Sequence, residues 1–309
     1  MDALEHDGLR FDVRDHAPAG SAPDSTPGST PGSTPGSTPG TAPGTAPVAV
    51  LLHGFPQDGS AYDAVVPPLV AAGVRVLVPD QRGYSPGARP PGRAAYALPR
   101  LVEDVRALLD AAGVGAAHVV GHDWGGSVAW AFAGRHPGRT ASLTALATPH
   151  PAALRLGLRH GDQARRSLYV AAFQVPGLPE RALLAGGAAR LREALVGSGL
   201  EADLAEPYVR RMQEPGALTA ALGWYRALPL ARMRTGPTRV PTTYLSARQD
   251  PFFARASVDA TAACVDAPVR HLDLDADHWL PEHRPLDVAA AVLSHVRRAS
   301  PPPDAGTLP

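Results

Sequence analysis

The chain has 309 residues, of which 44% are hydrophobic, which suits one large α/β domain or a domain with a sizeable insertion. Its 29 basic and 29 acidic residues balance, so we expect neither a nucleic acid nor a membrane surface as a partner. The single cysteine, Cys264, excludes an internal disulfide and is typical of a reducing compartment. Neither a signal peptide nor an apolar run of about 20 residues is visible, so a cytoplasmic protein is expected.

The first strand-like segment, residues 9–15, is followed by a repeat that reads STPGSTPGSTPGSTPG and continues as TAPGTAP. Proline at every fourth position removes a backbone donor, and no side chain in the repeat is bulky enough to offset the ordering entropy. We predict that residues 19–45 form a disordered loop between two neighbouring strands, 9–15 and 48–54. Residues 301–309 are predicted to be a flexible tail.

After the repeat, apolar strand-like runs alternate with helical patterns, which predicts a mostly parallel sheet flanked by helices. The helical patterns cover residues 97–113 and 127–137. The strand-like runs are VAVLLHG (48–54), VRVLVPD (74–80), AHVVGHD (117–123), LTALATP (143–149), PTTYLSA (241–247) and VRHLDLD (269–275).

Strand-like runs are missing between residues 151 and 235, a segment rich in Ala, Leu and Arg. We interpret this segment as a helical cap, or lid, inserted into an α/β core. The core is then expected to consist of residues 1–18, 46–150 and 236–300.

The stretch VVGHDWGGSVAW, residues 119–130, predicts a sharp turn between a strand and a helix. Small residues leave room for such a turn at Gly121, Gly125 and Gly126. The turn places Asp123 at the end of the sheet, near the positive end of the following helix, where functional sites of parallel sheets gather. The alternative is that Asp123 merely caps that helix.

Two further residues complete a possible catalytic set with Asp123. Asp250 comes directly after the strand-like run 241–247, and His278 comes after the run 269–275. Both are therefore expected at the same sheet edge as Asp123. The chain order nucleophile, acid, histidine is the order that such elbows use.

At these residues the chain resembles an epoxide hydrolase of the α/β-hydrolase fold, and the resemblance covers everything outside the repeat and the tail. One departure is Asp277, because the family usually has glycine before the histidine. The segments that carry the resemblance are HGFPQ (53–57), GHDWGG (121–126), PHP (149–151), SLYVAAFQVPGLPE (167–180) and LGWYRALP (222–229).

The resemblance implies a role for each site residue. Asp123 would attack the epoxide, because a carboxylate leaves an ester that water can cleave, whereas a serine would leave an ether. Tyr169 and Tyr225 would protonate the epoxide oxygen, and His278, oriented by Asp250, would activate water. The backbone N–H groups of Phe55 and Trp124 would stabilise the oxyanion. Neither a cofactor nor a metal is expected.

Aromatic residues beside these positions suggest an apolar pocket for a small epoxide, with water as the second substrate. The alternative is that some of these rings only fill the seam between the core and the cap. The predicted pocket residues are Phe55, Trp124, Phe173, Trp224 and Trp279.

Two other functions remain open from the sequence. A haloalkane dehalogenase shares the Asp nucleophile but needs donors for a departing halide, which Trp124 and Trp224 could supply. A non-catalytic ligand-binding protein of the same fold is the second alternative, although binding alone would not require the Asp250–His278 pair. The sequence predicts neither the preferred epoxide, the stereochemistry nor the oligomeric state.

Overall fold

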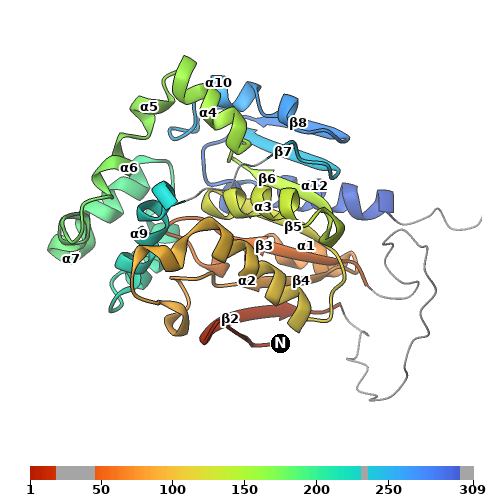
Figure 1. The fold of residues 1–309 in the computed structure, drawn as a ribbon, viewed down its shortest axis with the longest axis horizontal. Helices are drawn as coiled ribbons and strands as arrows, with labels where there is room; N and C mark the ends of the chain where they lie inside the picture. The colour runs from red at the N-terminus through yellow and green to blue at the C-terminus, as the bar shows by residue number, and fades with distance from the viewer. Residues whose placement is uncertain (19–45, 231–235, 300–309) are drawn as a thin grey trace, which may run out of the picture.

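The computed structural model describes residues 1–18, 46–230 and 236–299, which form an α/β architecture around one eight-stranded sheet (Figure 1). The first two strands pair antiparallel to their neighbours, and the other strands pair in parallel. The predicted mostly parallel sheet is therefore confirmed. The strands, in their order across the sheet, are β1 (Ala3–His6), β2 (Leu9–His16), β4 (Arg75–Pro79), β3 (Val48–Leu52), β5 (Ala117–His122), β6 (Thr140–Leu146), β7 (Thr242–Ala247) and β8 (Val269–Leu274).

The N-terminal edge of the sheet differs from the prediction. The strands β2 and β3 are consecutive in the chain but not neighbours, because β4 lies between them and pairs with both. The strand β1 was not predicted at all; it forms a hairpin with β2 through Asp7 and Gly8, both at positive φ. The predicted loop 19–45 and tail 301–309 lie outside the described residues.

Helices cover both faces of the sheet (Figure 1). Helices α1 (Val66–Ala71) and α12 (Pro285–Ala299) lie on one face, and α2 (Leu98–Ala111) and α3 (Trp124–Arg135) lie on the other. The apolar residues of α2 recur every three or four positions and are buried, which is the pattern of a helix packed on a sheet. These layers enclose the central strands, whose side chains form the core.

A run of helices separates β6 from β7, and we call residues 151–230 the helical insertion. In Figure 1 most of it extends to the left of the sheet, with α7 farthest out. The backbone of α7 leaves helical geometry between Ala185 and Ala188. None of the helices in the described ranges is both long enough and apolar enough to cross a lipid bilayer. The helices of the insertion are α4 (Pro151–His160), α5 (Gln163–Arg166), α6 (Leu168–Ala172), α7 (Leu178–Gly197), α8 (Ala202–Met212) and α9 (Ala217–Arg226).

Candidate active site

The turn between β5 and α3 has the strained geometry that the sequence predicted. Asp123 alone separates the two elements, with φ 50° and ψ −118°, which a residue with a side chain rarely adopts. Strain of this kind is typical of functional sites. The helix begins at Trp124, three residues earlier than the predicted start at residue 127, because the glycines after Trp124 are already helical.

Glycines allow the backbone of neighbouring loops to approach the turn closely. A Cβ atom on Gly54 would lie 2.4 Å from the Cβ of Asp123, and one on Gly125 would lie 2.1 Å from the carbonyl oxygen of Leu52. Larger residues at these positions would push the loop after β3 away from Asp123. The glycines therefore hold the N–H groups of that loop within reach of the Asp123 carboxylate.

Asp123, His278 and Asp250 meet at the carboxyl ends of β5, β8 and β7. The Nδ1 atom of His278 is 2.8 Å from Asp250 Oδ2, and its Nε2 atom is 3.8 Å from Asp123 Oδ2. The other oxygen of Asp250 accepts the backbone N–H groups of Phe252 and Phe253 at 2.7 and 3.2 Å. The carboxylate is thus held in place, and it orients the imidazole toward Asp123.

The two oxygens of Asp123 have different surroundings. Oδ1 accepts the backbone N–H of Phe55 at 2.9 Å, whereas Oδ2 faces His278. Burial raises the pKa of Asp123, and the nearby His278 together with the backbone N–H groups of Phe55 and Trp124 partly opposes this effect. Oδ2 is thus the carboxylate oxygen that faces the imidazole.

The imidazole of His278 is 2% exposed and carries a raised pKa. Burial alone would lower this pKa, but the charge and hydrogen bond of Asp250 outweigh it, and the charge of Asp123 adds to the increase. The protonation of His278 therefore depends on whether both carboxylates are charged.

Both predicted tyrosines lie over this site, one from α6 and one from α9. The rings of Tyr169 and Tyr225 are 6.0 Å apart, and Gln174 joins the two segments by donating to the Tyr225 carbonyl at 2.8 Å. Burial raises the pKa of both phenols, and the charge of Asp123 raises each further. That electrostatic effect indicates that both hydroxyl groups lie within range of the Asp123 carboxylate.

Three of the five predicted pocket aromatics surround Tyr225. The rings of Phe55, Phe173 and Trp124 lie 5.3, 5.0 and 5.0 Å from it, and all three are half-buried. They form an apolar wall beside Asp123.

The other two predicted pocket residues, Trp224 and Trp279, are each only 1% exposed. Trp224 donates its indole N–H to the Arg82 carbonyl at 2.8 Å, and Trp279 donates to Ser198 Oγ at 3.2 Å. Each bond joins the core to the helical insertion. Because both residues also fill the seam between the core and the insertion, their place in the substrate pocket stays a prediction.

Comparisons with known proteins agree with this geometry. The family described as alpha/beta hydrolase fold matches residues 47–285. The protein YfhM of Bacillus subtilis, named as an AB hydrolase superfamily protein, is 34% identical over 80% of this chain and 89% of its own length. Epoxide hydrolase A of Mycobacterium tuberculosis is 32% identical, also over 80% of this chain and 89% of its own length.

The chain belongs to the epoxide hydrolase family of α/β hydrolases. The crystal structure of epoxide hydrolase A from Mycobacterium thermoresistibile superposes with a TM-score of 0.76 at 26% identity, covering 96% of this chain and 97% of that chain. The similarity therefore includes the helical insertion as well as the sheet.

The structure also places two phenylalanines, which were not predicted as site residues, against His278. The ring of Phe252 lies 4.7 Å from that of His278 and 6.0 Å from that of Tyr169, and the ring of Phe253 lies 6.0 Å from His278. Their position directly after Asp250 was the signal in the sequence. Both rings shield the Asp250–His278 pair from water.

A buried polar network behind the site was also not predicted. The Nε2 atom of His122 lies 2.8 Å from the His278 carbonyl oxygen, and its Nδ1 atom lies 2.8 Å from Gln57 Oε1. Gln57 Oε1 accepts the Gly54 N–H at 2.9 Å, and Gln57 Nε2 donates to Glu282 Oε1 at 2.7 Å. The network thus links the loop that carries Phe55 to the loop that carries His278.

Glu282 ends this network in an enclosed position. Burial raises its pKa to about 7, although Gln57 and Tyr208 both donate to its Oε1 atom. Its Oε2 atom is buried and has no hydrogen-bond partner among the described residues. An ionised carboxylate is therefore poorly solvated there.

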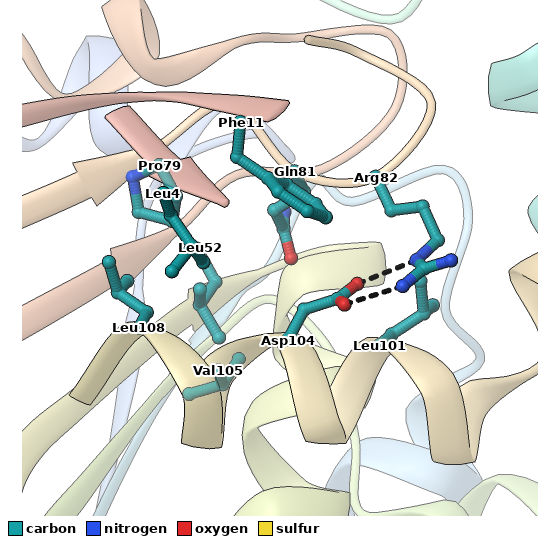
Figure 2. Close-up of a pocket in the computed structure, with 10 residues that line it drawn as sticks. All are labelled: Leu4, Phe11, Leu52, Pro79, Gln81, Arg82, Leu101, Asp104, Val105 and Leu108. Carbon is teal, nitrogen blue, oxygen red and sulfur yellow. Dashed lines mark hydrogen bonds and ion pairs between the residues drawn. The ribbon is translucent and has the colours of Figure 1, made fainter. Parts of the chain in front are cut away.

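A small cavity of about 20 Å³ lies elsewhere, between β1, β2 and α2 (Figure 2). Arg82 and Asp104 form its polar wall through two hydrogen bonds of 2.8 and 2.7 Å, and the remaining lining is largely apolar. None of the predicted site residues lines it. The backbone carbonyl of Arg82 accepts the Trp224 N–H, so the segment beside this cavity also contacts the helical insertion.

The described residues contain no group of three or more His, Cys, Asp or Glu side chains that could hold a metal ion. The expectation that the reaction needs neither a metal nor a cofactor stays a prediction.

Proposed function

We propose that the protein converts a small apolar epoxide to a vicinal diol through a covalent ester on Asp123. The observation that carries the proposal is the geometry of one carboxylate. Asp123 Oδ1 is held by the Phe55 N–H, while Oδ2 points to His278, which is itself held by Asp250. A nucleophile, an oxyanion donor and an oriented base thus converge on the same side chain.

In the first half of the reaction, Oδ2 of Asp123 attacks a saturated epoxide carbon and the carbon–oxygen bond of the ring breaks. Tyr169 and Tyr225 hydrogen-bond the departing oxygen, and one of them protonates the alkoxide. General acids of this kind contribute about 10²–10⁴-fold in rate. The half-buried rings of Phe55, Phe173 and Trp124 would hold the apolar part of the substrate.

In the second half, His278 removes a proton from water, and the resulting hydroxide attacks the carbonyl carbon of the ester. The oxyanion that forms on the former Oδ1 atom is stabilised by the N–H groups of Phe55 and Trp124. Each such donor is worth about 10²–10³ in rate. As the tetrahedral intermediate collapses, the bond between the acyl carbon and Oδ2 breaks, and protonated His278 returns its proton to the leaving diol oxygen. The proton of the new Asp123 carboxyl group returns to the tyrosinate, which restores the Asp123 carboxylate.

Ester formation also switches the acid and the base. The charge of Asp123 raises the pKa of His278 and of both tyrosines, and the ester no longer carries this charge. The phenols therefore become stronger acids when the alkoxide needs a proton. The pKa of the His278 imidazole falls as well, which favours its neutral form when a base is needed to activate water.

Within this proposal, residues 151–235 act as the cap, which brings both tyrosines to the site. Residues 1–18, 46–150 and 236–300 act as the core that holds Asp123, Asp250 and His278. The balanced charge and the single cysteine support a cytoplasmic location.

A haloalkane dehalogenase is less well supported, because a departing halide needs N–H donors. The Trp224 indole already donates to the Arg82 carbonyl, and the Phe55 side chain carries no donor. Only Trp124 remains of the donors considered from the sequence.

Separate incubations with styrene oxide and a bromoalkane distinguish the candidate functions. We expect diol from styrene oxide and no bromide from the bromoalkane. Bromide without diol would favour the dehalogenase. Neither product, together with no covalent adduct by mass spectrometry, would favour a ligand-binding protein.

A further inference from the structure

The loop that carries His278 is joined to the helical insertion through Asp277, the residue directly before the histidine. One oxygen of Asp277 accepts the Trp279 N–H at 3.0 Å and lies 2.8 Å from His283 Nδ1. The other nitrogen of His283, Nε2, lies 2.6 Å from the carboxylate of Glu201, just before α8. A chain of three side chains therefore runs from the catalytic loop to the insertion.

Two more contacts join the same partners. Trp279 donates its indole N–H to Ser198 Oγ at 3.2 Å. Gly199 has φ +112°, and a Cβ atom on it would lie 2.5 Å from Asp277 Oδ2. The turn between α7 and α8, residues 198–201, thus lies directly against the residues on both sides of His278.

Charge favours this contact. Burial would lower the pKa of His283, but Asp277 and Glu201 outweigh burial and raise it, which favours the protonated imidazole between the two carboxylates. The side chains of Asp277 and His283 are 19% and 18% exposed, whereas Glu201 is 65% exposed. The Asp277–His283 bond is therefore the stronger of the two, and the more exposed His283–Glu201 bond orients the turn between α7 and α8.

We propose that the turn 198–201 positions His278 for ester hydrolysis, with Asp277 and His283 as positioning residues between them. The inference rests on the proposed function, because it assigns the contact to the second half of that reaction. The insertion then serves both halves, since it supplies the tyrosines for ring opening and also orients the base. Asp277 is the residue through which this chain makes the connection.

The test uses the full chain with Glu201→Gln and His283→Gln variants, and styrene oxide as the probe. Rapid-quench mass spectrometry measures formation and decay of the Asp123 ester in a single turnover. We expect ester decay to slow by about tenfold in His283→Gln and about threefold in Glu201→Gln, with ester formation unchanged. At steady state, kcat and KM then fall together when decay limits turnover, so that kcat/KM stays constant.

Glu206→Gln is the matched control, because Glu206 lies in α8 and pairs with Arg192 of α7, so its loss breaks an ion pair without touching the catalytic loop. Its ester should form and decay as in the unmodified protein. Glu201 is exposed, so its variant stays informative even if His283→Gln fails to fold.

The outcomes separate this inference from the proposed function. If the unmodified protein forms neither an ester nor a diol, the proposed function fails. If it forms and hydrolyses the ester but both variants decay at the unmodified rate, the positioning role is overturned. Equal slowing in Glu206→Gln, or slowing of ester formation, would overturn it as well.

Discussion

Asp123 Oδ2 and His278 Nε2 lie 3.8 Å apart, too far for a hydrogen bond and close enough for strong electrostatic coupling. Asp250 occupies the other nitrogen of the imidazole at 2.8 Å. His278 can therefore bind a water molecule beside Asp123 without first breaking a hydrogen bond to Asp123. Any change in the charge of Asp123 changes the basicity of His278.

Replacing the base should trap the intermediate. We expect His278→Gln to form the Asp123 ester and to hydrolyse it about 10²–10⁴-fold more slowly than the unmodified protein. Intact-protein mass spectrometry after mixing with styrene oxide should show one bound substrate. His136→Gln, which removes a histidine paired with Glu103, should show no adduct. Normal turnover by His278→Gln would mean that another group is the base.

Removing the charge of the nucleophile should mimic the ester. We expect Asp123→Asn to lower the pKa of His278, because the charge of Asp123 is one of the effects that raise it. A titration of the His278 ring by nuclear magnetic resonance measures this change. Asp110→Asn, which removes a carboxylate paired with Arg106 on α2, is the control and should leave the pKa unchanged. An unchanged or higher pKa in Asp123→Asn would contradict the proposed switch.

The two phenols should act only in ring opening. We expect Tyr169→Phe and Tyr225→Phe each to slow ester formation by about 10²-fold, and the double variant to lose more, while ester hydrolysis stays unchanged. Single-turnover measurements separate the two steps. Tyr96→Phe, whose hydroxyl donates to the Pro90 carbonyl, serves as the control. A double variant that opens the ring at the normal rate would remove the tyrosines from the mechanism.

Glu282 should make stability depend on pH. Its pKa is about 7 in the folded protein and 4.5 as the reference value, so the folded protein binds the extra proton between these values and loses stability as the pH rises through them. As the pH rises from 4.5 to 8, the unfolding free energy of Glu282→Gln should increase by up to about 3 kcal/mol relative to that of the unmodified protein. Denaturant unfolding across this range measures the gain.

Glu206→Gln is the control and should show a difference that changes little from pH 4.5 to 8, because Arg192 lowers the pKa of that exposed carboxylate and its titration lies mainly below this range. A pH-independent difference between Glu282→Gln and the unmodified protein would show that Glu282 does not titrate as inferred.

The meeting of Asp123, Asp250 and His278 could be predicted because each residue follows a strand of a parallel sheet. Such strands all end at one edge, so Asp123, Asp250 and His278 had to lie near one another once the strands were recognised. The Asp7–Gly8 pair also favours a two-residue turn, but β1 has only four residues, too few for a clear strand pattern in the sequence.

Other features depend on contacts that the sequence does not encode locally. Gln57 and Glu282 are 225 residues apart, and nothing near either one indicates the other. The partner of the Trp224 indole is a backbone carbonyl, which any residue at position 82 would provide. The pairing of β2 with β4 likewise follows from the completed sheet, and not from the order of strands in the chain.

The origin of the oxygen in the first diol tests the covalent ester most directly. A single turnover with enzyme in excess over styrene oxide in ¹⁸O-labelled water should give a diol without the heavy isotope, because the added oxygen comes from Asp123. The peptide that contains Asp123 should gain one ¹⁸O atom. A first-cycle diol that carries ¹⁸O, with an unlabelled Asp123, would show direct attack by water and contradict the ester.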